Sequence, residues 1–122
     1  MRGVGTDIVD VHRLWRSIRR QATFVETVFS ADERRFCDAQ PRPEQHYAAR
    51  FAAKEAFLKA LGLGIFSGVA LQEIEVVREP SGQPRLRLGP TAAAALQQAG
   101  GEDPLISLSH EHGMALAFVV VP

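Results

Sequence analysis

The stretch RFAAKEAFLKA, residues 50–60, lies in the strongest predicted helix of this chain. We expect the helix to run from about Glu44 to Leu61, because alanine, leucine, lysine and glutamate all favour helical backbone. Gly62 and Gly64 follow directly, and a glycine just past the last turn is a common way to end a helix. The centre of the chain is therefore predicted to be one long helix.

The residues before this helix predict one strand and two shorter helices. Residues 2–9 contain β-favouring valine and isoleucine and form the strand. A helical repeat follows, with one apolar and one basic side. The apolar side has Val11, Leu14, Trp15, Ile18 and Ala22, and the basic side has Arg13, Arg16 and Arg20. Ser30 and Glu33 form a capping-box pattern for a helix from Ala31 to Asp38.

The residues after the central helix predict a hairpin, a helix and two final strands. A glycine-containing loop leads to two stretches of alternating polar and apolar residues, which flank the turn at 80–84. The expected elements cover residues 73–77, 85–88, 90–99, 105–109 and 114–121. This order of hairpins and isolated helices indicates an α+β fold, in which a small antiparallel sheet packs with helices.

The composition is that of a globular domain and excludes several classes of protein. The chain has 122 residues, 46% hydrophobic and 23% charged, so we expect one domain over residues 1–122. Its longest apolar run, 114–121, is far shorter than the roughly 20 residues of a membrane-spanning helix. Cys37 is the only cysteine, which excludes an internal disulfide and a cysteine-based zinc site. No signal-peptide pattern is present at the start, and a cytoplasmic location is expected.

Charge is balanced over the chain but not along it. Fourteen basic and 14 acidic residues give a net charge of zero, which argues against a protein that coats nucleic acid. Between Val11 and Val25 there are four arginines and no acid, so the first helix carries a local basic patch. The one aromatic residue between these arginines, Trp15, falls on the apolar side of the helix, which further weakens a nucleic-acid interpretation.

Glu55 and Lys59 stand four residues apart in the central helix and therefore share one face. Two interpretations are open. The pair could be an exposed ion pair worth roughly 0.3–0.5 kcal/mol. Alternatively, Ala48 and Ala52 on the same face leave room for a ligand. A divalent cation held by Glu55 and a second carboxylate, with Lys59 beside it, would suit a pyrophosphate.

Asp7 is an acid within an apolar strand, between Val4 and Ile8. A carboxylate buried there needs a partner, because an unpaired buried charge is costly. Strand alternation equally allows Asp7 to lie on a solvated face of an edge strand. The strand pattern alone leaves both possibilities open.

The motif His-Glu-His at 110–112 lacks the helical spacing of a zinc-binding His-Glu-x-x-His motif, so zinc is not expected. His110 instead ends a predicted strand directly after Ser109, a position from which functional side chains are often presented. The glycines at 62–68 follow a helix rather than precede one, which excludes a phosphate-binding loop of the Walker type.

Three stretches together resemble the signatures of one enzyme family. They are GVGTDIVD at 3–10, RFAAKEAFLKA at 50–60 and LSH at 108–110. In order and spacing they are similar to the holo-acyl-carrier-protein synthases, the short-chain 4′-phosphopantetheinyl transferases. The resemblance covers essentially the whole chain, and its middle stretch is the most specific. Residues 38–45 and 66–68 depart from the family pattern.

The resemblance implies a transferase with the 4′-phosphopantetheinyl transferase-like fold. Family members move the phosphopantetheine arm of coenzyme A to a serine hydroxyl of an acyl carrier protein. They release adenosine 3′,5′-bisphosphate, with Mg²⁺ on the pyrophosphate. The carrier could serve fatty acid or polyketide synthesis, acyl-coenzyme A could be a further substrate, and Mn²⁺ could replace Mg²⁺.

The resemblance also implies a role for each matching residue. Asp7 and Glu55 would hold the metal, and Glu55 or a metal-bound water would accept the serine proton. Lys59 would contact the pyrophosphate on the leaving side. Ser109 and His110 would hold the nucleotide part of coenzyme A, in particular its ribose phosphate.

Similar enzymes are trimers with sites between neighbouring subunits, so a homotrimer is expected. On a helical wheel Arg50 points about 140° away from Glu55, which makes a shared site within one chain difficult. Arg50 would then reach the nucleotide of a neighbouring subunit. A salt bridge within its own chain is the alternative.

The acyl carrier protein is acidic, as the resemblance implies, and Arg13, Arg16 and Arg20 are the expected docking surface. Arg13 follows Asp7 by six residues, so a carrier bound there would bring its serine near the metal. A non-catalytic binding module on the same fold is the second interpretation. Asp7, Glu55 and Lys59 argue against it, because a module that only binds does not need a metal site.

Overall fold

The computed structural model describes residues 2–122, and its strands form two antiparallel sheets. The larger sheet has the order β1–β5–β4, and the smaller one is the hairpin β2–β3. The strands are β1 (Gly3–Asp10), β2 (Ile74–Arg78), β3 (Pro84–Leu88), β4 (Leu105–Glu111) and β5 (Met114–Val121). The predicted hairpin and the predicted final strands are therefore present, but they belong to different sheets.

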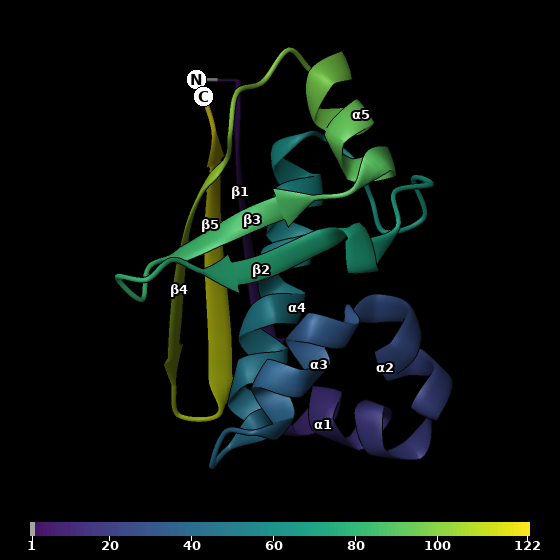
Figure 1. Ribbon diagram of the computed structural model, residues 1–122, viewed down its shortest axis with the longest axis vertical. Coiled ribbons are helices and arrows are strands. Elements are labelled where there is room, and N and C mark those ends of the chain that lie inside the picture. Colours follow the sequence, from purple (N-terminus) through teal and green to yellow (C-terminus); the bar gives the residue numbers. More distant parts are fainter. Residues whose placement is uncertain (1) are drawn as a thin grey trace.

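The helices surround these sheets in an α+β arrangement, as predicted. They are α1 (Val11–Arg20), α2 (Ala22–Val28), α3 (Ala31–Asp38), α4 (Pro43–Ala60), the 3₁₀ helix η1 (Leu71–Glu73) and α5 (Pro90–Gln98). Figure 1 shows α4 packed against the larger sheet, while the hairpin β2–β3 crosses the other side of α4. The helices α1, α2 and α3 gather at one end of α4, and α5 lies at the end near the C-terminus.

The helix α4 is alanine-rich because the rest of the fold covers it on most sides. Eleven of its 18 residues are buried, and six of these are alanines. Small side chains let the sheet and the hairpin both approach the helix closely at interior packing density. Neither α4 nor any other helix within residues 2–122 has the length and hydrophobicity to cross a membrane.

A fully buried ion pair joins α4 to α3 and to the hairpin. Lys54 Nζ donates to Glu33 Oε1 at 2.8 Å, to the carbonyl oxygen of Ile74 at 2.7 Å and to that of Leu71 at 3.0 Å. Glu33 Oε2 accepts from the amide of Val76 at 3.0 Å. Lys54 therefore holds α4 to the segment that leads into β2.

The helix expected over residues 11–22 is divided in two. Gln21 has extended backbone, with φ −131° and ψ 100°, so α1 ends at Arg20 and Ala22 begins α2. The prediction for Ala22 was therefore wrong: it is exposed and does not belong to the apolar side of α1. The other four residues of that side are buried or half-buried, as predicted.

The strand β4 continues to Glu111, two residues further than expected. His112 and Gly113 both have left-handed backbone, with φ 52° and 75°, and make a two-residue turn into β5. Ser109 and His110 therefore lie within the strand rather than at its end.

Candidate active site

Asp7 and Lys59 meet where β1 crosses α4. The Lys59 ammonium donates to Asp7 Oδ1 at 3.1 Å and to the carbonyl oxygen of Thr6 at 3.2 Å. The Asp7 side chain is only 10% exposed, whereas that of Lys59 is 55% exposed. The solvated-face interpretation of Asp7 was therefore wrong, because this side of β1 packs against α4.

Glu55 faces the same carboxylate. Partial burial raises the pKa of Glu55. The negative charge of Asp7 and a hydrogen bond between the two carboxyl groups raise this pKa further, whereas the positive charge of Lys59 lowers it. That hydrogen bond exists only when one carboxyl group holds a proton. Asp7 Oδ2 is buried and has no donor among residues 2–122. Two carboxylates this close need either a shared proton or a cation.

Of the two interpretations left open for Glu55 and Lys59, the exposed ion pair between them does not form. Lys59 pairs with Asp7, and no ion pair among residues 2–122 includes Glu55. The physical reason is that β1 brings a second acid within reach of the ammonium, which a helical wheel cannot reveal. Glu55 keeps its oxygens available for other partners.

The carboxylates of Asp7 and Glu55 fit a hard divalent cation, because Asp7 Oδ2 is buried and has no partner among residues 2–122. Among residues 2–122, no group of three or more His, Cys, Asp or Glu side chains could hold a metal by itself. Mg²⁺ does not require such a cage, because it is usually held by one or two carboxylates together with substrate phosphates and water. Asp7 and Glu55 therefore fit Mg²⁺ in the presence of a phosphate ligand.

Glu55 lies between two hollows in the surface. The first has a volume of about 310 Å³ and includes Asp7, Arg13, Phe24 and Phe51 in its lining. The second has a volume of about 250 Å³ and is lined by Glu55, Leu58, Lys59, Leu63, Gly64 and Ile65. One carboxylate therefore borders two spaces, one with Arg13 and one with Lys59.

Sequence reasoning missed the aromatic lining of the first hollow. Phe24 lies in α2, an element that was not predicted, and Phe51 projects from α4 beside it, with their ring centroids 6.2 Å apart. The spacing of Phe51 and Glu55 could have predicted that Phe51 lies beside the site, since residues four apart in a helix share a face. No local signal indicated Phe24.

The three arginines of the basic side of α1 are exposed, as predicted. Arg13 lines the hollow that contains Asp7, and its amide donates to the N-cap residue Asp10 at 2.9 Å. Arg16 and Arg20 lie further along α1 and do not line this hollow. Only Arg13 is therefore close to the paired carboxylates.

Ser109 and His110 are not brought to the paired carboxylates within one chain. They lie on β4, which β5 separates from β1. Both border a different hollow of about 410 Å³, together with Ile8 and Met114. The residues expected to bind the nucleotide thus stand apart from those expected to bind the metal.

Arg50 occupies a third place, with 2% of its surface exposed. Its guanidinium lies 4.5 Å from the ring centroid of Phe36, its Nη1 donates to the carbonyl oxygen of His46, and its Nε has no partner among residues 2–122. Burial lowers its pKa. The alternative of an ordinary salt bridge was wrong, because no carboxylate of residues 2–122 pairs with Arg50.

Arg50 also lies beside His46, to whose carbonyl oxygen its Nη1 donates at 3.4 Å. Burial lowers the pKa of His46, and the positive charges of Arg50 and Arg78 lower it further.

The sequence and the fold both match known proteins. The family model described as "4'-phosphopantetheinyl transferase superfamily" matches residues 3–117. The holo-[acyl-carrier-protein] synthase of Geotalea daltonii is 41% identical over 120 residues, which are 98% of this chain and 96% of the relative. That of Methylobacterium radiotolerans is 45% identical over 98% of this chain and 91% of the relative.

The chain belongs to the holo-[acyl-carrier-protein] synthases. The solved structure of the synthase from Neisseria meningitidis has a TM-score of 0.90 and 33% identity, covering 100% of this chain and 98% of that one. The synthase from Helicobacter pylori, solved in complex with coenzyme A, has a TM-score of 0.84 and 29% identity, covering 98% and 99%. The resemblance seen in the sequence is thereby confirmed, and the protein is an enzyme of this family.

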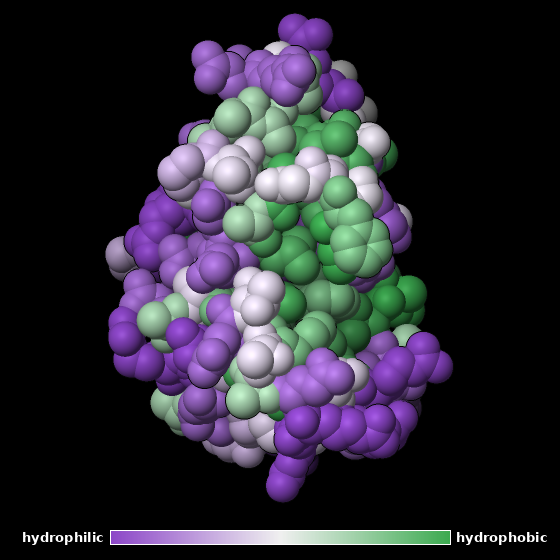
Figure 2. Space-filling view, turned by 90° about the vertical axis from the view of Figure 1, so that its right-hand side faces the viewer, coloured by the Kyte–Doolittle hydropathy of each residue, from purple (hydrophilic) through white to green (hydrophobic). Residues whose placement is uncertain are grey.

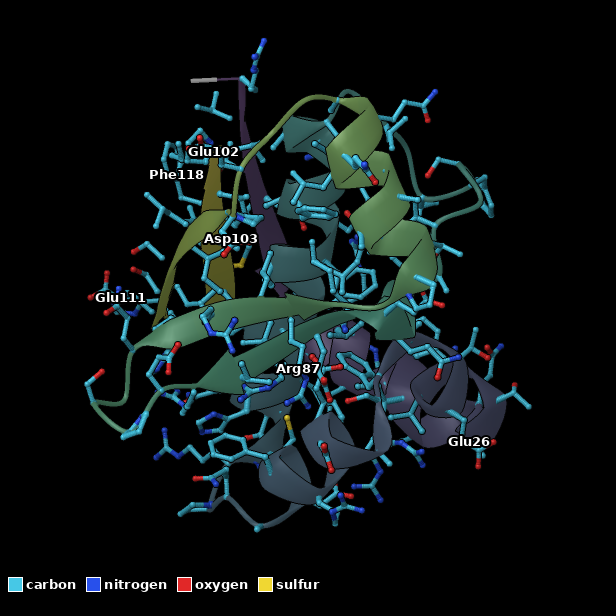
Figure 3. The ribbon with its side chains drawn as sticks, turned by 45° about the horizontal axis from the view of Figure 1, so that its top comes forward. Glu26, Arg87, Glu102, Asp103, Glu111 and Phe118 are labelled. Carbon is cyan, nitrogen blue, oxygen red and sulfur yellow. The ribbon has the colours of Figure 1, made fainter. Side chains whose placement is uncertain are left out.

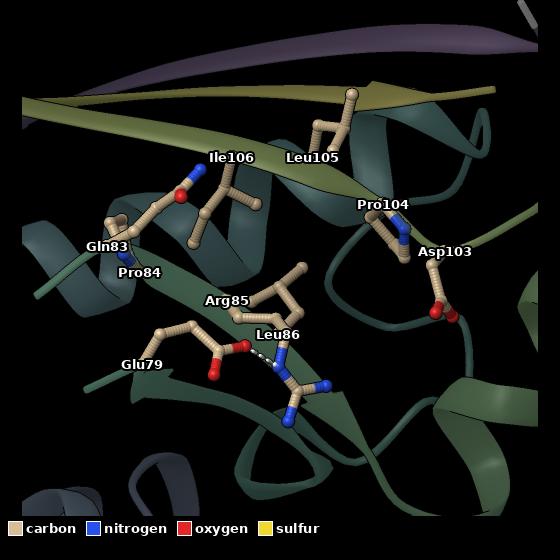
Figure 4. A pocket seen from close by; sticks show the side chains of 9 residues that line it. All are labelled: Glu79, Gln83, Pro84, Arg85, Leu86, Asp103, Pro104, Leu105 and Ile106. Carbon is tan, nitrogen blue, oxygen red and sulfur yellow. Dashed lines mark ion pairs between the residues drawn. The ribbon is translucent and has the colours of Figure 1, made fainter. Parts of the chain in front are cut away.

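Another hollow of this member of the family is lined by residues other than the paired carboxylates. It lies between the hairpin β2–β3 and β4, with a volume of about 250 Å³ (Figure 4). Glu79 and Arg85 form an ion pair at its rim, at 2.6 Å, while Leu86 and Ile106 line its interior. It shares no residue with the hollows that border Glu55.

Proposed function

We propose that the protein transfers the 4′-phosphopantetheine arm of coenzyme A to a serine hydroxyl of apo acyl carrier protein, with release of adenosine 3′,5′-bisphosphate. The observation that carries the proposal is the position of Glu55. It borders one space with Lys59 and another with Arg13 and Asp7, and the buried Oδ2 of Asp7 has no partner among residues 2–122. The geometry suits a pyrophosphate on one side and an acceptor hydroxyl on the other.

Asp7 and Glu55 are the residues that would hold Mg²⁺, which neutralises pyrophosphate charge when it is bound. The side chain of Lys59 is more than half exposed beside Asp7. It is therefore free to contact the phosphate that leaves with the nucleotide and to stabilise the negative charge that develops there.

The transfer forms one bond and breaks one. The serine oxygen bonds to the phosphorus that carries pantetheine, and the bond from this phosphorus to the oxygen of adenosine 3′,5′-bisphosphate breaks. Glu55 accepts the serine proton, because its carboxylate borders the hollow that would receive the acceptor hydroxyl. The leaving phosphate departs with the bonding electron pair.

The nucleotide end of coenzyme A is assigned to Ser109, His110 and Arg50. Ser109 and His110 lie on β4, which β5 separates from β1, and the Arg50 guanidinium packs on Phe36 rather than beside Glu55, which supports a site built from two neighbouring chains. One chain would then supply Asp7, Glu55 and Lys59, and its neighbour Arg50. The buried guanidinium without a carboxylate partner supports an anionic ligand such as the ribose phosphate.

A homotrimer follows from this arrangement and from the surface of the larger sheet. The face of the sheet opposite α4 exposes several large apolar side chains, which are Val4, Ile8, Leu105, Leu116 and Phe118. Phe118 and Glu111 point away from the helices (Figure 3). An apolar sheet face of this kind indicates a protein interface, and we assign it to copies of this chain.

The experiment incubates apo acyl carrier protein of fatty acid synthesis with the protein, coenzyme A and Mg²⁺, and follows carrier mass. A gain of one phosphopantetheine group is expected. Asp7→Asn and Glu55→Gln should each lower the transfer rate at least about a hundredfold while the fold persists, because each removes one anionic oxygen. Full activity of both variants would exclude the two-carboxylate site. No mass gain despite carrier binding would favour the non-catalytic binding module.

A further inference from the structure

We infer that Gly5 is a positioning residue, which sets the distance of Asp7 from Glu55 and Lys59. The absence of a side chain at Gly5 lets β1 lie directly on the backbone of α4. The inference rests on the proposed function, since it concerns the same pair of carboxylates. It assigns no contact with substrate to Gly5 itself.

The contact between β1 and α4 leaves no room for a Cβ atom at Gly5. An added Cβ would overlap the carbonyl oxygen of Ala56 and would lie 2.7 Å from the amide nitrogen of Ala60, whereas ordinary van der Waals contact begins at 3.4 Å. Both obstacles are backbone atoms of a buried helix, so no side-chain rotation relieves them. At Gly3 an added Cβ would overlap the carbonyl oxygen of Ala60 in the same way.

This contact lies beside the candidate site in both elements. In β1, Gly5 and Asp7 are two residues apart and therefore project to the same face. In α4, Ala56 follows Glu55 directly, and Lys59 reaches back to Thr6 and Asp7. A shift of β1 away from α4 therefore lengthens the 3.1 Å contact of Lys59 with Asp7. It also separates Asp7 from Glu55.

Neither β1 nor α4 can move away from the other without weakening its contacts with the rest of the fold. Lys54 fixes the opposite side of α4 through its buried bonds to Glu33 and to the carbonyl oxygens of Leu71 and Ile74. All eight residues of β1 pair with β5, Gly5 with Val119 and Asp7 with Ala117. A side chain at Gly5 must nevertheless open the gap between β1 and α4, at a cost in stability, because the atoms in its way belong to the backbone of α4.

The test compares Gly5→Ala with Gly101→Ala. Gly101 is also crowded, since an added Cβ would press on the side chains of Val121 and Leu96, but it lies outside the hollows that border Glu55. Binding of Mn²⁺ in the presence of coenzyme A is measured by the loss of the free-ion electron paramagnetic resonance signal. Gly5→Ala should weaken Mn²⁺ binding about 10–100-fold, as residues that support metal ligands commonly do. Gly101→Ala should lower thermal stability without changing Mn²⁺ affinity.

Changing the length of Asp7 separates positioning from folding. In Gly5→Ala the additional replacement Asp7→Glu should recover Mn²⁺ affinity, because a longer side chain spans the wider gap. In the otherwise unchanged protein Asp7→Glu should weaken binding, since the longer side chain moves its carboxylate from the distance that suits a cation shared with Glu55. The second measurement stands even if Gly5→Ala does not fold.

Three outcomes would overturn the inference: normal Mn²⁺ affinity in folded Gly5→Ala, an equal loss in Gly101→Ala, or normal affinity in Asp7→Glu alone. The proposed function fails in a different way. In that case the unchanged protein does not bind Mn²⁺, or Asp7→Asn keeps its transfer activity.

Discussion

Glu55 has a raised pKa because it is partly buried and faces the carboxyl group of Asp7. The folded, metal-free protein therefore keeps a proton that the unfolded chain releases. By linkage, the contribution of Glu55 to the free energy of unfolding is present at low pH. It is lost as pH rises from the ordinary value of 4.5 through the raised pKa of the folded state.

We expect urea unfolding in the presence of a chelator to show this loss in the unchanged protein and not in Glu55→Gln. Added Mg²⁺ should then stabilise the unchanged protein at neutral pH, since a cation that binds only the folded state raises the free energy of unfolding. Parallel pH profiles for the two proteins would contradict the coupling between Glu55 and Asp7.

At the scale of elements, Lys54 and Glu33 join α3, α4 and the start of β2 through one buried pair whose side chains are both 0% exposed. Removing one partner of such a pair leaves an uncompensated charge in the interior. Lys54→Met should therefore lower the free energy of unfolding by about 3–5 kcal/mol, measured by urea denaturation.

The matched control is the exposed pair of Arg85 and Glu79. Arg85→Met should cost less than about 1 kcal/mol, because water screens the pair and solvates either partner alone. Similar losses for Lys54→Met and Arg85→Met would show that the buried pair contributes nothing beyond a surface ion pair.

The first arginine of the basic side of α1, Arg13, lines the hollow that contains Asp7, whereas Arg16 and Arg20 lie further along the helix. Arg13→Glu should raise the KM for acyl carrier protein at least about tenfold at low salt, since exposed complementary charges act mainly on encounter. The KM for coenzyme A should change little, and the salt dependence of kcat/KM should flatten.

Arg19→Glu is the control for this prediction. It makes the same charge change on the same helix, outside the stripe of Arg13, Arg16 and Arg20, and should affect the carrier less. Equal rises in both KM values for Arg13→Glu, or an equal effect of Arg19→Glu, would place the docking surface elsewhere.

At the scale of the whole molecule, apolar side chains remain exposed in two separate regions. One is the outer face of the larger sheet, where Phe118 is 42% exposed. The other is the loop over residues 61–70, where Phe66 is 99% exposed. Figure 2 views the molecule from the side of this loop and shows a hydrophobic area between more hydrophilic ends. Only the sheet face offers a broad, regular surface for another copy.

Light scattering should give a particle of about 40 kDa, three times the 13.4 kDa chain. Phe118→Glu should yield the monomer and abolish transfer, because Arg50 could no longer reach a neighbouring site. Phe66→Glu places the same charge on an exposed aromatic away from the sheet and should leave the size unchanged. An active monomer would remove the shared site.

Local signals in the sequence determined most of the elements and the family. The capping box of Ser30 and Glu33 predicted α3 from Ala31 to Asp38, and the unbroken apolar run predicted β5 from Met114 to Val121. Both depend on residues near one another in the chain. The signature at 50–60 likewise identified the family, because it is a contiguous pattern of side chains.

Only the tertiary structure decided which side chains meet. Lys59 pairs with Asp7, 52 residues away, rather than with Glu55 one turn away, because β1 packs on α4. Lys54 and Arg50 carry charges that composition would place at the surface, yet the hairpin and α3 bury them. Helical and strand periods reveal which face a residue occupies, but the partner of that face depends on packing between distant segments.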